Sequence, residues 1–330
     1  MDKKRALVMT SAAVLWVISA LLSLSMGAAG LTLGQLWQAL WKGPGDTAGY
    51  IFWYVRLPRT GACLLAGAAL AVSGAVIQGV LHNKLASPGI IGINAGGGLA
   101  VTACCALGCY GGWAVAGSAF GGAMAAALLV VGLSGKTGAS RTTVILCGVA
   151  VNALLNALSE AVTKLVPEAA MYSVDFRVGG FAAVSHVRLI PAGILILAAL
   201  AVVMTLCNDL DILALGSETA QSLGVPVKPM RRLFLILAAM LAGAAVSFAG
   251  LLGFVGLIVP HAVRALVGEE NRFVLPLCAV GGSCLVTMCD LVCRMLFAPY
   301  ELPVGIGMSV LGAPFFLVLL LKQRGGKHHA

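Results

Sequence analysis

Long apolar stretches alternate with short polar stretches along the whole chain. The clearest apolar stretch is uncharged from Thr60 to Leu81, and as a helix it would be roughly 33 Å long, enough to cross the hydrocarbon core of a bilayer. It follows Arg56-Leu57-Pro58-Arg59 and precedes a polar turn that ends in Pro88-Gly89. Because glycine and alanine fill much of its length, other backbones can approach it closely. The pattern predicts a spanning helix inside a helical bundle.

Nine further apolar stretches bring the number of predicted membrane segments to ten. One of them, Gly256–Val267, is too short to cross alone and follows several glycines, so we expect half of a broken helix buried in protein. The chain is therefore predicted to be a single all-α, polytopic transmembrane domain over residues 1–330. The ten segments are Ala6–Met26, Thr60–Leu81, Ile91–Leu107, Trp113–Leu133, Thr143–Leu165, Ile190–Cys207, Leu233–Leu251, Gly256–Val267, Phe273–Cys293 and Val304–Leu321.

Composition supports this class and excludes others. Hydrophobic residues make up 60% of the chain and charged residues 10%, whereas a soluble domain carries roughly a quarter charged residues. A transmembrane β-barrel would show short alternating segments instead. The net charge of +9 does not indicate nucleic-acid binding, because the cations lie in short loops between apolar segments.

The distribution of cations predicts the orientation. An even number of spans puts both termini on one side, and a cytoplasmic N-terminus places fourteen of the 21 Lys and Arg residues inside. We expect a retained first span rather than a cleaved signal peptide. The orientation leaves Arg56, Arg59 and Arg294 on the outer face. Asp290 lies four residues before Arg294, which permits an ion pair along one helix, and Glu301 is expected to cap the last span.

Two loops are long enough to form helices. The outer loop contains LTLGQLWQALW, which predicts a short surface helix. The inner loop predicts one or two short amphipathic helices over about residues 209–227, interrupted at Gly216 and ended by Gly224-Val225-Pro226. Apolar-faced helices outside a membrane should dock on another protein. The alternative is that they lie on lipid headgroups.

The residue pattern does not indicate bond chemistry. The sequence contains no HExxH motif and no recognisable triad, and its ten cysteines are scattered through apolar segments without repeated CxxC spacing. We expect small buried thiols, a packed His261, no cofactor, no resident metal and no catalytic site.

Six stretches, in this order, resemble the iron-siderophore and cobalamin permeases of the FecCD type, the membrane subunits of type II ABC importers. The resemblance covers nearly the whole chain. It departs from the family at Lys84, where the family usually has proline, and at Asp175–Gly180 (DFRVGG), where the family more often has tryptophan and Gly-Ser. The stretches are RLPR, GAALAVSGAVIQ, NKLASPGIIGINAG, LGSETAQSLGV, GFVGLIVPHAVR and ELPVGIGMSVLGAPFF.

The resemblance implies a transport subunit in the cytoplasmic (inner) membrane of a bacterium that translocates an iron-siderophore, haem or cobalamin. It implies a dimer with the path at its two-fold axis, two separate ATPase subunits and an extracytoplasmic substrate-binding protein; a homodimer and a pair of homologues both remain open. It assigns Arg56, Arg59 and Arg294 to binding-protein docking. The cytoplasmic gates would be formed by Asn83, Leu85, Thr142 and Thr143, and ATPase coupling by Leu215, Gly216, Ser217, Glu218, Ala220, Leu223 and Gly224.

The main alternative is an ion-coupled secondary transporter, which would need no ATPase. Such proteins usually carry ionisable residues near the bilayer midplane. Here the centres of the predicted spans are almost uncharged and Asp290 lies toward an end. The sequence therefore favours the ABC importer.

Overall fold

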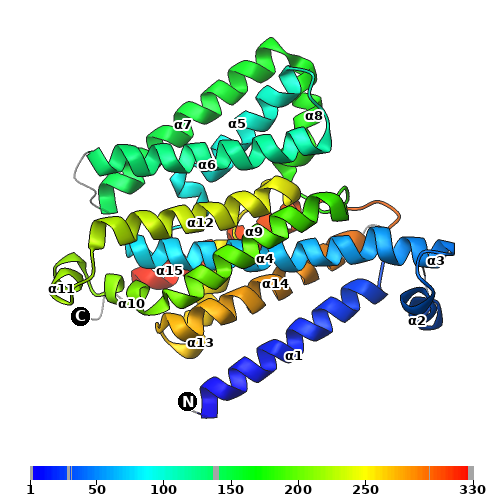
Figure 1. Cartoon of the computed structure of the whole chain (residues 1–330), viewed down its shortest axis with the longest axis horizontal. Helices are drawn as coiled ribbons and strands as arrows, with labels where there is room; N and C mark the ends of the chain where they lie inside the picture. Colours follow the sequence, from blue (N-terminus) through cyan, green and yellow to red (C-terminus); the bar gives the residue numbers. More distant parts are fainter. Residues whose placement is uncertain (1–2, 28–29, 31, 137–140, 297, 326–330) are drawn as a thin grey trace.

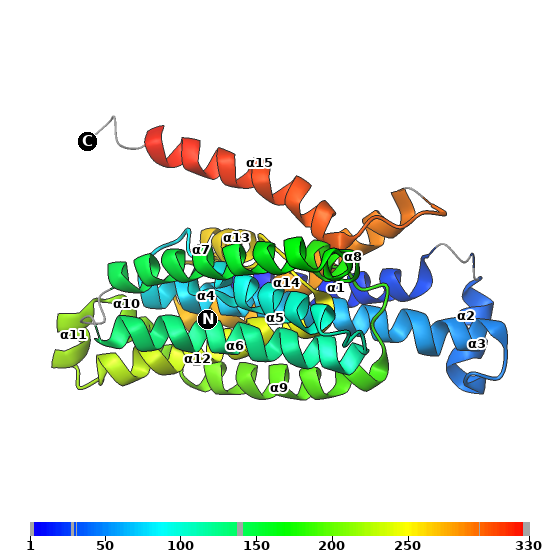
Figure 2. The same cartoon turned by 90° about the horizontal axis from the view of Figure 1, so that it is seen from above.

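The computed structural model describes residues 3–27, 30, 32–136, 141–296 and 298–325, and helices are the regular elements of this part of the chain. Most of them run along one axis of an elongated bundle (Figures 1 and 2). In chain order they are α1 (Lys3–Ser25), α2 (Leu33–Lys42), α3 (Thr47–Tyr50), the π-helix η1 (Ile51–Arg56), α4 (Leu57–Leu81), the 3₁₀-helix η2 (Pro88–Ile91), α5 (Ile93–Ala106), α6 (Gly112–Lys136), α7 (Arg141–Leu165), α8 (Pro167–Val178), α9 (His186–Thr205), α10 (Cys207–Ala214), α11 (Ser217–Ser222), α12 (Val227–Ala249), α13 (Val255–Val267), α14 (Asn271–Leu296) and α15 (Val304–Gly325).

Each of the ten predicted segments corresponds to a helix. Seven helical stretches are long and apolar enough to cross a membrane, and three shorter apolar helices, Ile93–Ala106, Val255–Val267 and Val304–Leu319, complete the set. The sequence had indicated only one short segment. The second span also begins earlier than predicted, because Thr47–Leu81 is one continuous helical run. Arg56 and Arg59 therefore lie within this run and not in a loop at its mouth.

Helix α4 forms the centre of the bundle and packs against α12, α13 and α14 (Figure 1). Its glycines permit this packing: Gly67 faces the backbone of Gly282 in α14, and Gly74 faces that of Gly256 in α13. A side-chain carbon at either position would overlap the neighbouring backbone. These contacts confirm that the small residues of the span bring other helices close.

The predicted broken helix is present and has a partner that the sequence did not reveal. Helix α12 ends before Gly250, and α13 starts after Phe254, whose φ of +65° is unusual for a residue with a side chain. The backbone of the break is hydrogen-bonded to the end of α8, with Leu251 N donating to Phe176 O at 2.9 Å. Gly180 N donates to Ala249 O at 2.8 Å. Helix α8, which was not predicted, thus pairs backbone groups that lipid could not satisfy.

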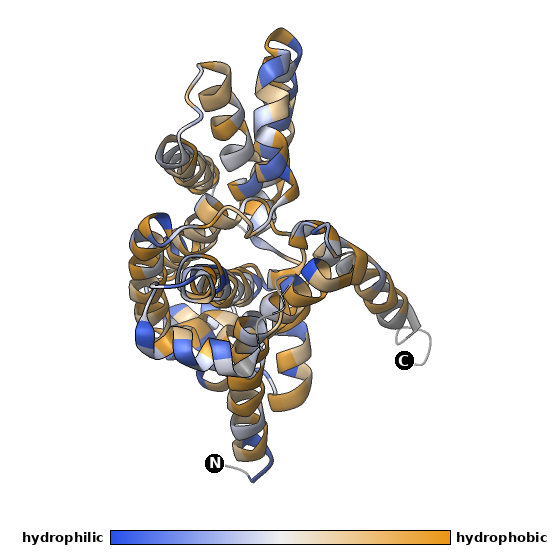
Figure 3. Cartoon of the chain, turned by 90° about the vertical axis from the view of Figure 1, so that its right-hand side faces the viewer, coloured by the Kyte–Doolittle hydropathy of each residue, from blue (hydrophilic) through white to orange (hydrophobic). Residues whose placement is uncertain are grey.

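Hydrophobic residues predominate along the long helices, as the hydropathy colouring shows in the view from the end that carries α2 and α3 (Figure 3). Large exposed apolar residues occur along α1, α7, α9 and α15. Helix α15 diverges from the bundle toward its C-terminal end (Figure 2). Surfaces of this kind require either lipid or another subunit as cover.

Candidate functional sites at the two ends of the bundle

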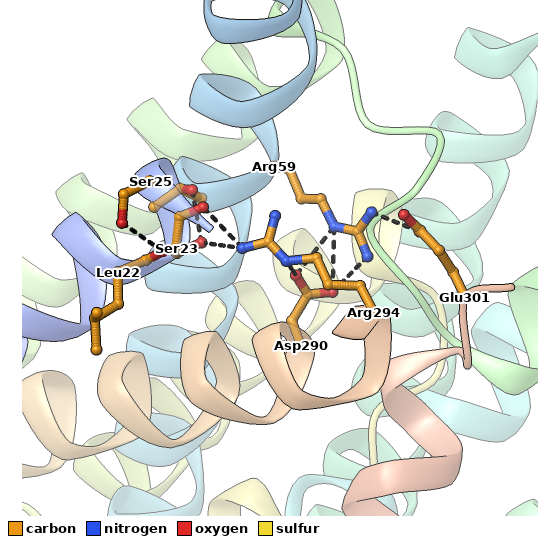
Figure 4. Close-up of polar contacts among 8 residues, drawn as sticks. Leu22, Ser23, Ser25, Arg59, Asp290, Arg294 and Glu301 are labelled. Carbon is orange, nitrogen blue, oxygen red and sulfur yellow. Dashed lines mark hydrogen bonds and ion pairs between the residues drawn. The ribbon is translucent and has the colours of Figure 1, made fainter. Parts of the chain in front are cut away.

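Charged residues gather around the N-terminal end of α4, the end predicted to face outward, and all of them except Glu301 are buried. We call this set the outer network: Arg56, Arg59, Asp290, Arg294 and Glu301. Arg59 is at its centre (Figure 4). Its Nε donates to Asp290 Oδ2 at 3.0 Å and its Nη2 to Asp290 Oδ1 at 2.9 Å. Its Nη1 donates to Glu301 Oε2 at 2.7 Å. This two-pronged pairing with one carboxylate is the strong geometry for arginine.

Arg56 and Arg294, the other two arginines of the outer network, donate hydrogen bonds to the C-terminal end of α1. Arg294 Nη2 donates to the carbonyl and to the hydroxyl of Ser23, both at 2.8 Å. Its Nε is 3.7 Å from Asp290 Oδ2, which confirms the predicted ion pair along α14. Arg56 Nη1 donates to the carbonyls of Leu24 and Ser25 at 2.8 and 2.6 Å. The network therefore joins α1, α4, α14 and the turn before α15.

This geometry differs from the expected display of three outward guanidinium groups. In the single chain Arg56, Arg59 and Arg294 are only 3%, 7% and 3% exposed. Burial of a charge requires partners, because an unpaired ion inside a protein is costly. Asp290 and Glu301 pair with Arg59, Asp290 also pairs with Arg294, and Arg56 donates to the backbone carbonyls of α1. Glu301 pairs with Arg59 and is not seen capping α15, and its side chain is 37% exposed. Docking by these arginines stays a prediction.

A small cavity of about 190 Å³ lies beside the outer network. Arg59 and Glu301 line it together with Asp175 and the 179–183 turn.

A second polar set lies at the C-terminal end of α4, and we call it the inner cluster: the charged residues Lys84, Arg264 and Glu269 with the neutral Gln78. Lys84 Nζ is 2.7 Å from Glu269 Oε1, and both side chains are well exposed, at 60% and 63%. Arg264 Nε is 3.2 Å from the other oxygen of Glu269. Arg264 also donates to Gln78 Oε1 and to Ala75 O, while Gln78 Nε2 donates to Gly256 O at 3.1 Å. The cluster ties the turn after α4 to the α13–α14 turn.

The proposed gate residues lie on two elements at this end. Asn83 Oδ1 accepts a 2.9 Å hydrogen bond from Leu85 N and so closes the turn after α4. Thr142 is exposed and Thr143 half-buried in the first turn of α7. The turn is held to α7 further along, where Asn152 Nδ2 donates to Gly89 O at 2.9 Å. Whether these residues close a path stays a prediction.

The two short helices predicted in the loop over about residues 209–227 are present as α10 and α11, and their coupling role stays a prediction. They meet at Gly216, whose φ is +115°, and α11 ends before Gly224, whose φ is +82°. Leu215 and Leu223 are 63% and 58% exposed, whereas Ala220 is buried against the bundle. A cavity of about 490 Å³ connects Leu215 and Ala214 of this region with Lys84, Arg264 and Glu269 of the inner cluster. The pair thus offers apolar side chains to solvent beside the candidate gate.

Other chemistry-bearing residues are dispersed. In the described part of the chain no three His, Cys, Asp or Glu side chains come together as metal ligands, and the ten cysteines are free. The His261 ring packs edge-on against Phe315, with centroids 6.0 Å apart, as expected for a packed histidine.

A multi-pass helical bundle with a central glycine-rich helix, a broken helix and an exposed short helix pair is typical of a membrane transport subunit. The chain belongs to the FecCD transport family, whose model matches residues 15–322. It is 36% identical to the hemin transport system permease protein HmuU of Yersinia pestis over 320 residues, 94% of each chain. It is 36% identical to the vitamin B12 import system permease protein BtuC of Salmonella paratyphi A over 328 residues, 94% of this chain and 96% of that one.

The fold also matches a solved structure, a metal-chelate type ABC transporter in an inward-facing conformation. The TM-score is 0.86 at 30% sequence identity, covering 96% of this chain and 99% of the other. The chain is accordingly a multi-pass permease subunit of an ABC importer, for which ATPase and binding-protein partners are expected. An ion-coupled secondary transporter is not supported.

Proposed function

We propose that this chain imports an iron chelate, haem or cobalamin as one half of a dimeric permease in the inner membrane of a bacterium. Both termini are cytoplasmic, residues 1–330 act as one permease domain, and the chain has no catalytic site of its own. The observation that carries the proposal is the exposed α10–α11 pair, which offers Leu215 and Leu223 for docking beside the inner cluster. Hydrolysis of ATP then takes place on the subunits that bind there.

The coupling role is tested at Gly224. Its φ of +82° is inaccessible to proline, whose ring fixes φ near −65°, so Gly224→Pro should distort the end of α11. The variant should insert normally but co-purify poorly with the ATPase subunits. Ser222→Ala is the matched control, because Ser222 is exposed and its hydroxyl bonds only to Thr219 O within its own helix. Normal assembly and normal stimulated ATPase activity of Gly224→Pro would contradict docking at α11.

The second subunit is proposed to be another copy of this chain. Helix α15 packs on the bundle near its start, yet Val310, Leu311, Leu317 and Val318 are exposed. A partner helix would cover these residues, and lipid would cover the remaining apolar faces. If a homodimer places the path at its axis, cysteines at Leu85 or Thr142, in a background without native cysteines, should cross-link between copies in a nucleotide-dependent manner. A functional dimer that never cross-links would remove them from the axis.

For the binding protein we propose an exchange of carboxylates at Arg59. The outer network contains three guanidinium groups and two carboxylates, which leaves one net positive charge, and Glu301 is its exposed acid. A carboxylate of the binding protein would take the place of Glu301. Glu301→Gln should then tighten docking and steepen its salt dependence, whereas Arg59→Gln should weaken docking. Equal affinity and equal salt slopes in all three proteins would refute this role.

Among the substrates, we propose an anionic iron chelate or haem rather than cobalamin. A cavity of about 480 Å³ between α8, the α12–α13 break and α15 is lined by Arg177, which lies in the DFRVGG stretch. Arg177 Nη2 donates to Ser159 Oγ at 2.7 Å. A cation in this position favours carboxylate or other anionic groups. Arg177→Gln should reduce import of an anionic ferric chelate more than import of a neutral one, and an equal effect on both would contradict this preference.

A further inference from the structure

Helix α2 is strongly amphipathic, and its apolar face is largely uncovered. Leu36, Trp37, Leu40 and Trp41 share one face at helical spacing. Trp37, Leu40 and Trp41 are 65%, 45% and 72% exposed, and the two indole rings stack edge to face with centroids 5.9 Å apart. The opposite face carries Gln35, Gln38 and Lys42.

Helix α2 is stabilised at its N-terminus by a capping box and is fixed to η1 by a hydrogen bond. Thr32 and Gln35 form a reciprocal capping box, in which Gln35 N donates to Thr32 Oγ1 and Thr32 N donates to Gln35 Oε1. Ala39 is buried, and its carbonyl accepts a 2.9 Å hydrogen bond from Trp53 Nε1 of η1. Helix α2 thus contacts the rest of the bundle through the side that carries Ala39. The indole rings of Trp37 and Trp41 lie on a different side of the helix and stay exposed.

The depth of α2 relative to the membrane follows from the outer network. Helix α1, 23 residues long and about 35 Å in length, matches the hydrocarbon core and ends at Ser25. Arg56 bonds to the carbonyls of Leu24 and Ser25, so it marks the outer end of that span. Trp53 lies three residues before Arg56, roughly 4–5 Å farther out. Because Trp53 holds α2, the helix lies at the level of the headgroups, which extend roughly 5–8 Å beyond the core on each side.

The orientation of α2 fits the same location. It runs across the outer end of the bundle rather than along it (Figures 1 and 2). Two exposed tyrosines, Tyr50 and Tyr54, lie on the neighbouring turns with ring centroids 4.8 Å apart. Tryptophan and tyrosine are the residues that gather where a membrane meets water, because one part of each ring system is apolar and another is polar.

We infer that α2 is an interfacial helix that inserts Trp37, Leu40 and Trp41 among the lipids of the outer leaflet. The inference goes beyond import itself; it rests on α1 being a membrane span and on the cytoplasmic N-terminus of the proposed function. Among the described residues, α1 is the least buried of the seven long apolar helices, so its exposed apolar side chains also require lipid or another subunit as cover. Lipid anchoring would hold the outer ends of α1 and η1 at a fixed depth.

Quenching of tryptophan fluorescence by nitroxide-labelled lipids tests this location in the assembled transporter reconstituted in bilayers. The fluorescence of Trp37 and Trp41 is obtained by subtracting the signal of the double variant Trp37→Tyr/Trp41→Tyr from that of the wild type, and we call it the pair signal. The double variant keeps Trp53 and its hydrogen bond to α2. Since an interfacial helix buries its apolar face only roughly 5–10 Å, nitroxides near the headgroups should quench the pair about twofold more than nitroxides near the chain ends. Trp113→Phe, which removes a tryptophan that is also exposed, is the control variant.

Three results would overturn the inference. One is quenching of the pair by aqueous iodide but not by labelled lipid, which would place the rings in water. Another is equal quenching by shallow and deep labels, which would place them inside the core. The third is shielding from iodide only after the substrate-binding protein is added, which would assign the face to that protein. Should the double variant assemble poorly, iodide access and lipid quenching of the wild type decide between the same outcomes.

Discussion

The two ends of α4 hold charges in opposite ways. At the outer end the three arginines of the outer network are almost completely buried and each makes several contacts. At the inner end Lys84 and Glu269 meet in solvent, and only Arg264 beneath them is nearly buried. Buried ion pairs are costly to break and exposed pairs are not. The contrast suggests that one end of the subunit is built as a rigid junction and the other as a junction that can open.

The largest effect is expected from Asp290→Asn. The change leaves the Arg59 and Arg294 guanidinium groups buried without their shared carboxylate, which should lower the free energy of unfolding by about 3–5 kcal/mol. Unfolding of the detergent-solubilised protein measures it. Glu301→Gln is the control within the same network and should cost about 1 kcal/mol or less, because Glu301 is partly in solvent. Comparable losses for both variants would remove the distinction between buried and exposed partners.

An intermediate effect is expected from Gln78→Leu. Gln78 is buried and connects the Arg264 guanidinium with the carbonyl of Gly256. Its loss removes the side-chain partner of that carbonyl and one of the hydrogen bonds of Arg264, which keeps its contacts with Ala75 O and Glu269. The cost should be about 1–3 kcal/mol of unfolding free energy. Gln221→Leu, at an exposed position of α11, serves as control and should change stability by less than about 0.5 kcal/mol. If Gln78→Leu left the free energy of unfolding unchanged, the buried hydrogen bonds of Gln78 would not contribute to stability at the inner end.

The smallest effect is expected from the Lys84–Glu269 pair. A double-mutant cycle with Lys84→Gln and Glu269→Gln should give a coupling energy of about 0–1 kcal/mol that disappears at high salt. Chemical denaturation at two salt concentrations provides the four stabilities. A coupling above about 2 kcal/mol, insensitive to salt, would mean that the turn after α4 is locked and not poised to open.

Hydrophobic patterning predicted most of the helices, because the length of an apolar stretch and the polarity of its flanks are enough to locate a membrane-spanning or amphipathic helix. The ten segments, the surface helix α2 and the α10–α11 pair each carry a periodic apolar stretch bounded by glycine, proline or polar residues. Helix α8 was missed because its sequence, PEAAMYSVDFRV, is short and has neither a continuous apolar run nor a clear apolar face. Its position became evident only from its hydrogen bonds to the α12–α13 break.

The outer network shows what spacing cannot reveal. The Asp290–Arg294 pair could be predicted because the two residues are one helical turn apart. The partners of Arg59 are 231 and 242 residues away in sequence, and no local pattern links them. By the positive-inside rule, Arg56, Arg59 and Arg294 are exceptions, because it predicts few cations at the outer end. The rule carries no information on whether such a cation is buried in an ion pair or exposed to solvent.

Hydrogen–deuterium exchange of the assembled transporter tests the contrast between the two ends most directly. Peptides over 56–64 and 288–296 report the outer network, and peptides over 78–91 and 264–271 report the inner cluster. Between the nucleotide-free and the ATP-trapped states, we expect exchange to change at the inner peptides and to stay slow and unchanged at the outer ones. Faster exchange at the outer peptides in either state, with the inner peptides unchanged, would contradict a rigid outer end and a mobile inner end.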